Sequence, residues 1–434
     1  MRAALACGLA VLLLCGAAPP QAVPTSRPLP GGGTAIVRNL DGAPLVAIEL
    51  WFRAPSIGFD ATPHPGIANV AAHAIAASVP LTGTPLATVV ARSGGRLGIA
   101  VYPHTIAVSA LVPAIEAAAT LRTMTAVYFT PVLTADGLDA ARTALRRDAR
   151  IRELTAPEEA LRDQLFAALF AGGPAHYAPE GDAATMTLSL DALTAFATRA
   201  FRAANATVVL CGAVNGDGNG DGELLSAAVE GRPQSGPGEP LVSASAQLAQ
   251  PPPPVSRESV ASGFGYAWAG PPISSELEAT ALDFIADYLF NPDTGTVMRA
   301  LSDADVNVAA QFVTYYDPGV LYVEATGRES SRARTAIDTA LAALRTPIGE
   351  TEFARARAEF EYHVLSDVST PLALADDFGW YASEGNVAYA PGADPNSGRY
   401  AQAIRALTPR FVAATAAKYL EAAPAVVTFS EHKT

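Results

Sequence analysis

Residues 66–73 read Gly-Ile-Ala-Asn-Val-Ala-Ala-His and contain two side chains that could bind a metal. In a helix, Asn69 and His73 lie one turn apart and share a face. Catalytic zinc normally takes three protein ligands and a water. One neutral imidazole and one weak amide oxygen fall short of that set. Ala72 offers no group that could accept a proton from water. The stretch therefore predicts a polar helix face without metal-dependent hydrolysis.

The same stretch resembles the active-site helix of the insulinase/pitrilysin (mitochondrial processing peptidase-like) zinc metallopeptidases. In that family a Gly-x-Ala-His start leads into His-x-x-Glu-His, whose histidines bind zinc and whose Glu acts as general base. The resemblance places Asn69 at the first His, Ala72 at the Glu and His73 at the second His. It implies the fold of the family, and the substitutions imply that neither zinc nor hydrolytic activity is retained. The remnant of the zinc site is then Asn69, Ala72 and His73.

Weaker similarity follows the family's order along nearly all of the chain. Residues 35–54 resemble the opening strand pair, and Gly94-Gly95 precede a strand as they do after the family's active-site helix. Residues from Phe264 onward resemble the family's C-terminal domain. The family's third ligand is a Glu on a later helix, and its spacing to Pro157 places Ala149 at that position. Asp148 is about 100° away around the helix, and Glu153 lies a turn further on.

The family's C-terminal domain often carries an Arg and a Tyr that grip the substrate backbone. The resemblance places these positions near Ser302 and Ala309. Arg299 and Tyr315 lie nearby but out of register, so this grip is not expected here.

Other candidate residues favour structural roles. His64 stands between prolines in an exposed turn, and the remaining histidines, His104, His176, His363 and His432, lie singly. Asp217, Asn219, Asp221 and Gly222 match the first half of a calcium loop, but its twelfth position is Ala228 where a Glu is needed. Cys211 lies in an apolar strand and is expected to be a buried, unreactive thiol.

The chain divides into two halves at a proline-rich stretch. We predict a signal peptide over 1–22, an N-terminal insulinase-like domain over 28–231, a linker over 232–255 and a C-terminal insulinase-like domain over 256–434. Such a linker cannot pack as helix or central strand. Both halves end in an Ala-rich helix that leads into a Val-Val strand, after Phe196 and after Phe411, which favours a duplicated domain.

Secondary structure is predicted to be mixed within each half. Strands are expected at 45–52, 97–108, 264–268, 306–316 and 321–326, with a hairpin turn at Asp317-Pro318. Ser275 and Glu278 form a capping-box pattern that opens a helix. The fold class is therefore α+β, with two homologous domains, each a mostly antiparallel sheet with helices on one face. The resemblance adds that the two domains enclose a cavity.

The net charge limits the class of partner, and the N-terminal sequence indicates the compartment. The net charge of −13 makes nucleic acid an unlikely partner class, because an acidic surface repels phosphates. Arg2 followed by an apolar stretch is typical of a secretory signal, and no later apolar run is long enough to span a membrane. We expect an exported protein, periplasmic or extracellular. Lipoprotein anchoring at Cys15 is the less favoured alternative, because Leu14 is bulky for a lipobox.

The sequence therefore favours a non-catalytic homologue of these peptidases. Its expected role is that of a partner subunit in a heterodimer with an active insulinase-like zinc peptidase, in which it helps to bind an extended peptide by strand addition. A stand-alone peptide-binding or scaffold protein is the alternative. A weaker alternative is an active peptidase with a rearranged zinc site that uses Asp148.

Overall fold

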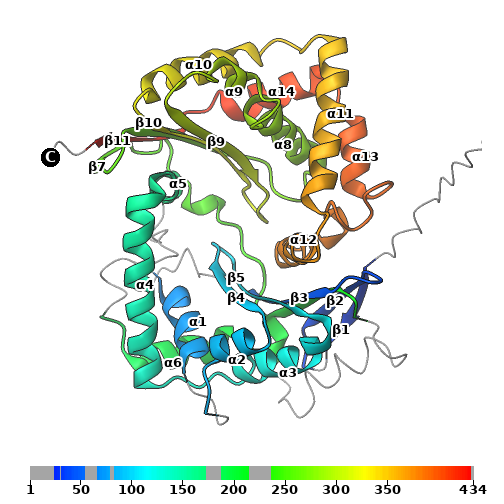
Figure 1. Cartoon of the computed structure of the whole chain (residues 1–434). Helices are drawn as coiled ribbons and strands as arrows, with labels where there is room; N and C mark the ends of the chain where they lie inside the picture. The colour runs from blue at the N-terminus through cyan, green and yellow to red at the C-terminus, as the bar shows by residue number, and fades with distance from the viewer. Residues whose placement is uncertain are drawn as a thin grey trace, which may run out of the picture.

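The computed structural model describes residues 24–29, 31–53, 66–78, 83–172, 187–214 and 236–431. These residues form an α+β structure with two halves, each built on one sheet, as the sequence predicts (Figure 1). The predicted signal peptide, His64, His176, His432 and the calcium-loop residues 217–228 lie outside the described residues. In the described part, no helix combines the length and the apolar character needed to cross a bilayer.

The N-terminal sheet has six strands in the order β1-β2-β6-β3-β5-β4. The pair β2/β6 is parallel and the other pairs are antiparallel. β3 lies in the middle and seven of its nine residues are buried, because both faces of this sheet are covered. The strands are β1 Thr25–Pro28, β2 Thr34–Asn39, β3 Leu45–Arg53, β4 Arg96–Val101, β5 Thr105–Pro113 and β6 Ala206–Gly212.

The C-terminal sheet repeats this arrangement with five strands in the order β7-β11-β8-β10-β9. Here β7/β11 is the parallel pair and the other pairs are antiparallel. The order and directions match β2-β6-β3-β5-β4, so the two halves share one topology, as the similar chain endings predict. The strands are β7 Val255–Ser259, β8 Gly263–Ala269, β9 Val306–Val313, β10 Val320–Gly327 and β11 Ala425–Glu431.

The helices also correspond between the halves. In four of the described helices, the side-chain oxygen of the N-cap residue accepts a hydrogen bond from a backbone N–H of the first turn. These N-cap residues are Thr134, Ser189, Thr370 and Thr408. Pro157 and Pro371 each open the helix that follows the longest helix of its half. The described helices are α1 Ile67–Ala77, α2 Leu86–Arg92, α3 Ala117–Tyr128, α4 Ala135–Thr155, α5 Pro157–Leu169, α6 Leu190–Ala200, α8 Glu276–Phe290, α9 Thr296–Ala300, α10 Ser330–Ala343, α11 Glu350–Asp367, α12 Pro371–Ser383, α13 Arg399–Ala406 and α14 Pro409–Leu420.

Three predicted elements differ in detail. The strand expected over 97–108 is a hairpin, because Pro103 falls in a turn between β4 and β5. The strand expected over 306–316 ends at Val313. Ser275 is the N-cap of α8, but its side chain caps no backbone group. The reciprocal bond of a capping box is lost as well, because Glu278 accepts from Lys418 Nζ at 2.7 Å on α14.

Each sheet packs its own helices on one face and a helix from the other half on the opposite face. α12 lies against β3 and β6, and α5 lies against β8, β10 and β11 (Figure 1). Leu374 and Phe378 of α12 join a core with Trp51 and Val209 of the N-terminal sheet. The exchange of helices therefore joins the two halves through buried apolar surface.

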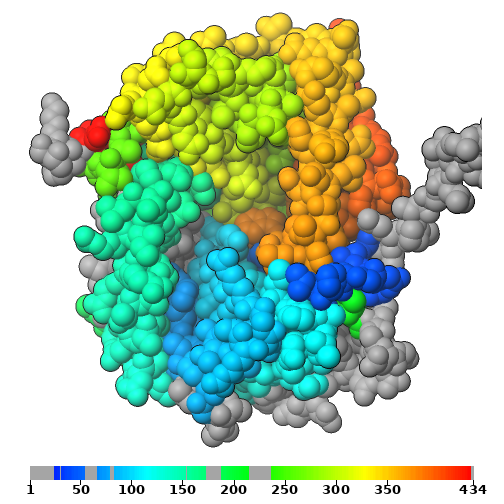
Figure 2. Space-filling view, in the orientation of Figure 1, coloured from blue at the N-terminus to red at the C-terminus, as the bar shows by residue number. Residues whose placement is uncertain are grey.

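The two halves leave a hollow between them. Figure 2 shows it between α4 on one side and α11 on the other, with the β4–β5 hairpin and α12 at its floor. The edge strand β4 of the N-terminal sheet borders this hollow.

Candidate functional site

The helix predicted to carry the remnant of a zinc site, α1, lies deep in the N-terminal half. Gly66 precedes α1 with φ 79°, a left-handed conformation that favours glycine. Nine of the eleven residues of α1 are buried against α4, α6 and the sheet, which explains the small residues in its sequence. The element therefore holds its polar residues rigidly at a fixed place beside α4.

Asn69 and His73 lie on one face of α1, as their spacing predicts. Asn69 is 5% exposed and His73 is half-buried. His73 Nδ1 lies 3.0 Å from the backbone oxygen of Asn69. Because a carbonyl oxygen only accepts, this contact places the proton of the neutral imidazole on Nδ1.

Ala72 belongs to the apolar core and does not face an open site. Its side chain is fully buried in the cluster that contains Val70 and Leu121. Its carbonyl accepts a hydrogen bond of 3.0 Å from the hydroxyl of Tyr128 on α3, and burial raises the pKa of Tyr128. A general base at this place would need space that apolar side chains occupy.

The position that the resemblance predicts for a third zinc ligand lies on α4, and the residues around it are exposed. Ala149 has no donor, and Asp148 points into solvent with an ion pair of 3.3 Å to Arg147. The side chain of Glu153 lies outside the described residues. Within the described ranges, no group of three His, Cys, Asp or Glu side chains is placed to hold a metal. The residue types Asn69, Ala72 and Ala149 do not fit a catalytic zinc ion, because one imidazole and one amide are a poor ligand set.

Arg299 and Tyr315, the candidates nearest to the predicted Arg and Tyr positions, make separate contacts in the described structure. Arg299 Nη1 donates to the backbone oxygen of Thr294, at the start of α9. Tyr315 is 5% exposed and packs its ring against His104 and Trp380. Ser302 is exposed in a turn, and Ala309 lies on β9 opposite Glu324. The absence of this grip stays a prediction from the sequence.

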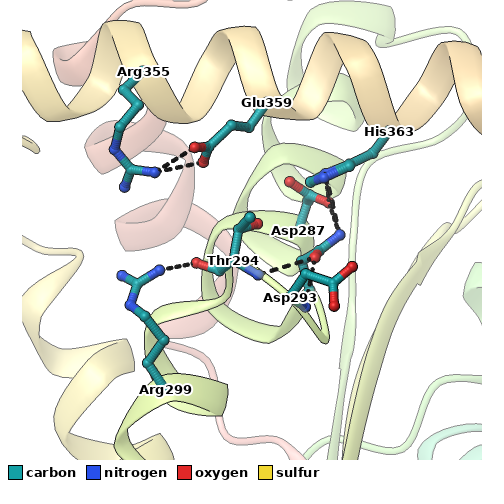
Figure 3. A network of polar contacts seen from close by, with 8 residues as sticks. Asp287, Asp293, Thr294, Arg299, Arg355, Glu359 and His363 are labelled. Atoms are coloured by element: carbon teal, nitrogen blue, oxygen red, sulfur yellow. Dashed lines mark hydrogen bonds and ion pairs between the residues drawn. The ribbon is translucent and has the colours of Figure 1, made fainter.

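The C-terminal half contains a polar network that the sequence did not predict, because His363 has no other candidate ligand near it in the sequence. His363 of α11 contacts Asp287 of α8, with Nδ1 and Oδ1 2.9 Å apart (Figure 3). Asn291 Nδ2 donates to the same carboxylate at 2.9 Å. The chain duplication could have revealed it: the shift that carries Pro157 to Pro371 carries Ala149 to His363. In the C-terminal half, α8 and α11 therefore hold a hydrogen-bonded pair of side chains at the place that corresponds to α1 and α4.

Two other predicted residues are buried in the described part. Cys211 is a fully buried free thiol, as expected, and burial raises its pKa well above the usual range. His104 lies at the tip of the β4–β5 hairpin with 7% of its surface exposed.

The β4 edge is the surface on which an extended peptide could bind. Among the strands that the structure describes, β4 pairs with β5 alone and lies at the edge of the sheet. Tyr102 N donates to Thr105 O at 2.8 Å, which makes these residues a hydrogen-bonded pair. Because such pairs alternate in an antiparallel ladder, the backbone groups of Leu97, Ile99 and Val101 face the open edge.

The family comparison matches the second part of the chain. Residues 187–360 match the family described as "Peptidase M16 inactive domain". The match begins after α1 and α4, so it does not include Asn69, Ala72, His73 or Ala149. No curated protein matches the chain.

Solved structures match nearly all of the chain in fold. A protease from Helicobacter pylori has a TM-score of 0.79 at 15% identity, over 94% of this chain and 100% of that one. An M16-like peptidase of Alicyclobacillus acidocaldarius has a TM-score of 0.75 at 16% identity, over 94% and 98%. A peptidase M16 inactive domain from Pseudomonas fluorescens has a TM-score of 0.75 at 18% identity, over 95% and 98%. At these identities the likeness shows a shared fold.

Proposed function

Because this chain is an insulinase/pitrilysin-like homologue with the fold of M16-like peptidases, we propose that it is a non-catalytic subunit that binds extended peptides beside an active zinc peptidase. The observation that carries the proposal is the combination of a donor-poor α1–α4 pair with an open sheet edge on the same hollow. A subunit with these features would hold substrate and leave hydrolysis to its partner.

The residues at the zinc-site positions support the absence of hydrolysis. Asn69 and Ala149 replace two ligands, and Ala72 replaces the group that would take a proton from water. A general base typically contributes about 10²- to 10⁴-fold in rate. Loss of the ligands and the base together would leave no route to an activated water.

The β4 edge supports peptide binding. An added strand gains backbone hydrogen bonds from the outward groups of Leu97, Ile99 and Val101, whatever its sequence. The alternative is a stand-alone peptide-binding or scaffold protein. Such a protein would use the same β4 edge but would have no peptidase partner. Export by residues 1–22 to the periplasm or the cell exterior belongs to this proposal and rests on the sequence.

The substitution Ile99→Pro tests the binding edge. Proline removes one outward N–H, and an edge strand tolerates it because no ladder bond is lost. We expect a fluorescein-labelled, extended peptide with alternating apolar residues to bind about 3- to 10-fold more weakly, the effect of one hydrogen bond. Ile99→Ala is the matched control, because it removes the side chain and keeps the N–H. Equal affinity of the Pro and Ala variants would contradict strand addition.

The same peptide tests catalysis and pairing. Incubated with the purified chain and added zinc, it should stay intact, and chelator-sensitive cleavage would revive the rearranged site that uses Asp148. A pull-down from the native host should capture a chain with an intact His-x-x-Glu-His. Capture of peptides without any such chain would favour the stand-alone alternative.

A further inference from the structure

The contact between α12 and the N-terminal sheet contains carboxyl groups that the proposed function does not use. Glu49 lies on β3, Asp376 and Asp377 lie on α12, and Glu384 is the C-cap residue of that helix. Glu49 and Glu384 are fully buried, and Asp376 is exposed at the rim of the contact. A carboxylate buried without a nearby cation is unfavourable, so such a group binds a proton instead. The charge of this contact therefore depends on pH.

Glu49 is the carboxyl group at the centre of the contact. Its Oε2 accepts a hydrogen bond of 2.6 Å from Trp51 Nε1, and its carboxyl group is also hydrogen-bonded to that of Asp376. Two carboxyl groups form such a bond only when one of them carries a proton, since ionised carboxylates only accept. Burial, and then the charge of Asp376, raise the pKa of Glu49 well above its usual range. The closed contact therefore holds a proton between β3 and α12.

Glu384 closes the contact at the C-terminal end of α12. Its Oε2 accepts from the backbone N of Tyr316 at 2.5 Å, and its Oε1 is buried without a hydrogen-bond partner among the described residues. Arg53 lies nearby, but its guanidinium donates to the backbone oxygens of Ala382 at 3.1 Å and Ser383 at 3.3 Å. Burial raises the pKa of Glu384 to about 8, although Arg53 acts in the opposite direction. This carboxyl group is therefore protonated near neutral pH.

Asp377 and the surrounding charges complete the contact. Asp377 Oδ2 accepts from the backbone N of Gly392 at 2.8 Å, and burial raises the pKa of Asp377 to about 7. In the described part of the sheet, Arg38 on β2 and Arg53 on β3 are the cations that face the contact. Full ionisation would therefore set four carboxylates against two arginines. The other titratable groups around the contact are Tyr102 after β4, Cys211 on β6, Asp283 on α8, Tyr381 on α12, Tyr389 in the turn after α12, and Asp394.

α5, the helix exchanged in the other direction, has balanced charges. Its Arg162 forms an ion pair with Glu324 of β10. Ionisation of Glu324 strengthens this pair, because the arginine attracts the carboxylate. A rise in pH therefore weakens the contact of α12 with the N-terminal sheet and leaves the contact of α5 with the C-terminal sheet in place.

We propose that α12 is a proton-dependent latch, which lies on the N-terminal sheet while Glu49 and Glu384 hold protons and moves away from it with the C-terminal half when they ionise. α5 then acts as the joint between the halves. Because the closed state binds the extra protons, closure is favoured at low pH and is lost as the pH rises through the pKa of Glu384, about 8. Opening returns this carboxyl group to water and its pKa to the ordinary 4.5. From this group alone, the ratio of open to closed molecules then rises about 100-fold between pH 6 and pH 9.

Thiol labelling of the native chain tests the latch. Cys211 is fully buried on β6, in one core cluster with Phe378 of α12, so it reacts when α12 moves away. With Cys7 and Cys15 changed to Ser, its labelling rate relative to a free thiol should rise at least about 100-fold from pH 6 to pH 9, because it follows the open population. Gln has the shape of a protonated Glu, so E49Q/E384Q should reduce this rise to about 10-fold or less. E350Q/E421Q replaces two exposed carboxyls and should behave like wild type.

Hydrogen exchange separates opening of the latch from unfolding. After correction for intrinsic rates, α12 and β3 should exchange faster at pH 9, while α1 on the other face of the sheet and β10 stay protected. Labelling that does not rise in wild type, an equal rise in E49Q/E384Q, or loss of protection in α1 and β10 together with α12 overturns the proposal. The single variants E49Q and E384Q each remove one proton from the transition, so an unchanged pH dependence in both also overturns it. These outcomes do not depend on peptide binding at the β4 edge.

Discussion

At the scale of single residues, His104 shows how burial sets a charge. Its imidazole lies where the β4–β5 hairpin meets the C-terminal half, and the ring centres of His104 and Tyr315 are 6.0 Å apart. Burial lowers the pKa of His104 from 6.5 to about 4, although the carboxylate of Asp317 acts in the opposite direction. The folded state therefore keeps this histidine neutral, and unfolding releases it to bind a proton.

The pH dependence of stability follows from this shift. Between pH 6.5 and about 4 the unfolded chain binds the proton and the folded chain does not, so His104 destabilises the fold progressively as the pH falls. The loss between pH 7.5 and 4 is about 3 kcal/mol from this group. Urea unfolding at several pH values should show that His104→Gln loses less stability on acidification than wild type. Parallel pH profiles for the two chains would refute this assignment.

The sequence predicted that Asn69 and His73 lie on one helix face, but it did not predict the contact between His363 and Asp287. Asn69 and His73 share a face because helical spacing alone decides it. The contact of His363 with Asp287 joins two helices distant in sequence, and only the packing of α11 on α8 creates it. The duplication of the chain makes His363 equivalent to Ala149 and so places His363 on a helix that corresponds to α4. A single histidine in the sequence does not by itself indicate that it has a carboxylate partner.

At the scale of elements, a glycine in α12 allows this helix to pack closely against the N-terminal sheet. A Cβ at Gly379 would lie 1.9 Å from Trp51 Nε1, so the helix backbone rests directly on the indole. Trp51 in turn donates to Glu49 Oε2 at 2.6 Å, and burial together with Asp376 raises the pKa of Glu49 well above its usual range. The close approach of α12 therefore covers a buried polar pair on β3.

Gly379→Ala should consequently destabilise the protein. Alanine favours a helix by about 1 kcal/mol over glycine, but the added methyl would push α12 away from β3, and overpacking of this kind costs about 1–3 kcal/mol or more. Chemical denaturation should show a net loss. Trp51→Leu gives the control: in that background the methyl has room, and Gly379→Ala should cost at least about 1 kcal/mol less. Equal costs in both backgrounds would show that Trp51 is not the obstacle.

Helices and strands were predicted correctly where one hydrophobic pattern continues through the element. They were predicted less well where a second local effect, such as a proline or a competing hydrogen bond, interrupts the pattern. The alternation over 97–108 continues through a turn, and Pro103, which cannot donate within a ladder, was the signal of the break. The capping-box pattern at Ser275 failed because Glu278 finds stronger partners, Lys418 and Tyr419, on α14. The exchange of α5 and α12 between the halves has no local signature, since each helix is amphipathic in either setting.

At the scale of the whole molecule, the exchanged helices make the two halves interdependent. α5 belongs to the N-terminal half and covers the C-terminal sheet, where Arg162 forms an ion pair with Glu324 and lies 4.8 Å over the ring of Tyr322. Glu324 is 1% exposed, and burial raises its pKa to about 7 in spite of the arginine. A charge pair at such a contact is costly to break from one side only.

Arg162→Met should therefore loosen both halves together. It leaves the Glu324 carboxyl buried without its partner, which typically costs about 3–5 kcal/mol. Because α5 leads directly from α4, hydrogen exchange should accelerate in α1 of the N-terminal half as well as in β8 and β10 of the C-terminal half. R162M/E324Q should recover part of the loss, since the neutral amide no longer needs the cation. Arg328→Met is the matched control, because it breaks an ion pair with Asp305 whose side chains are 86% and 70% exposed, and such pairs contribute little. If exchange rose only in the C-terminal sheet, the halves would be independent folding units and the exchanged helix would not couple them.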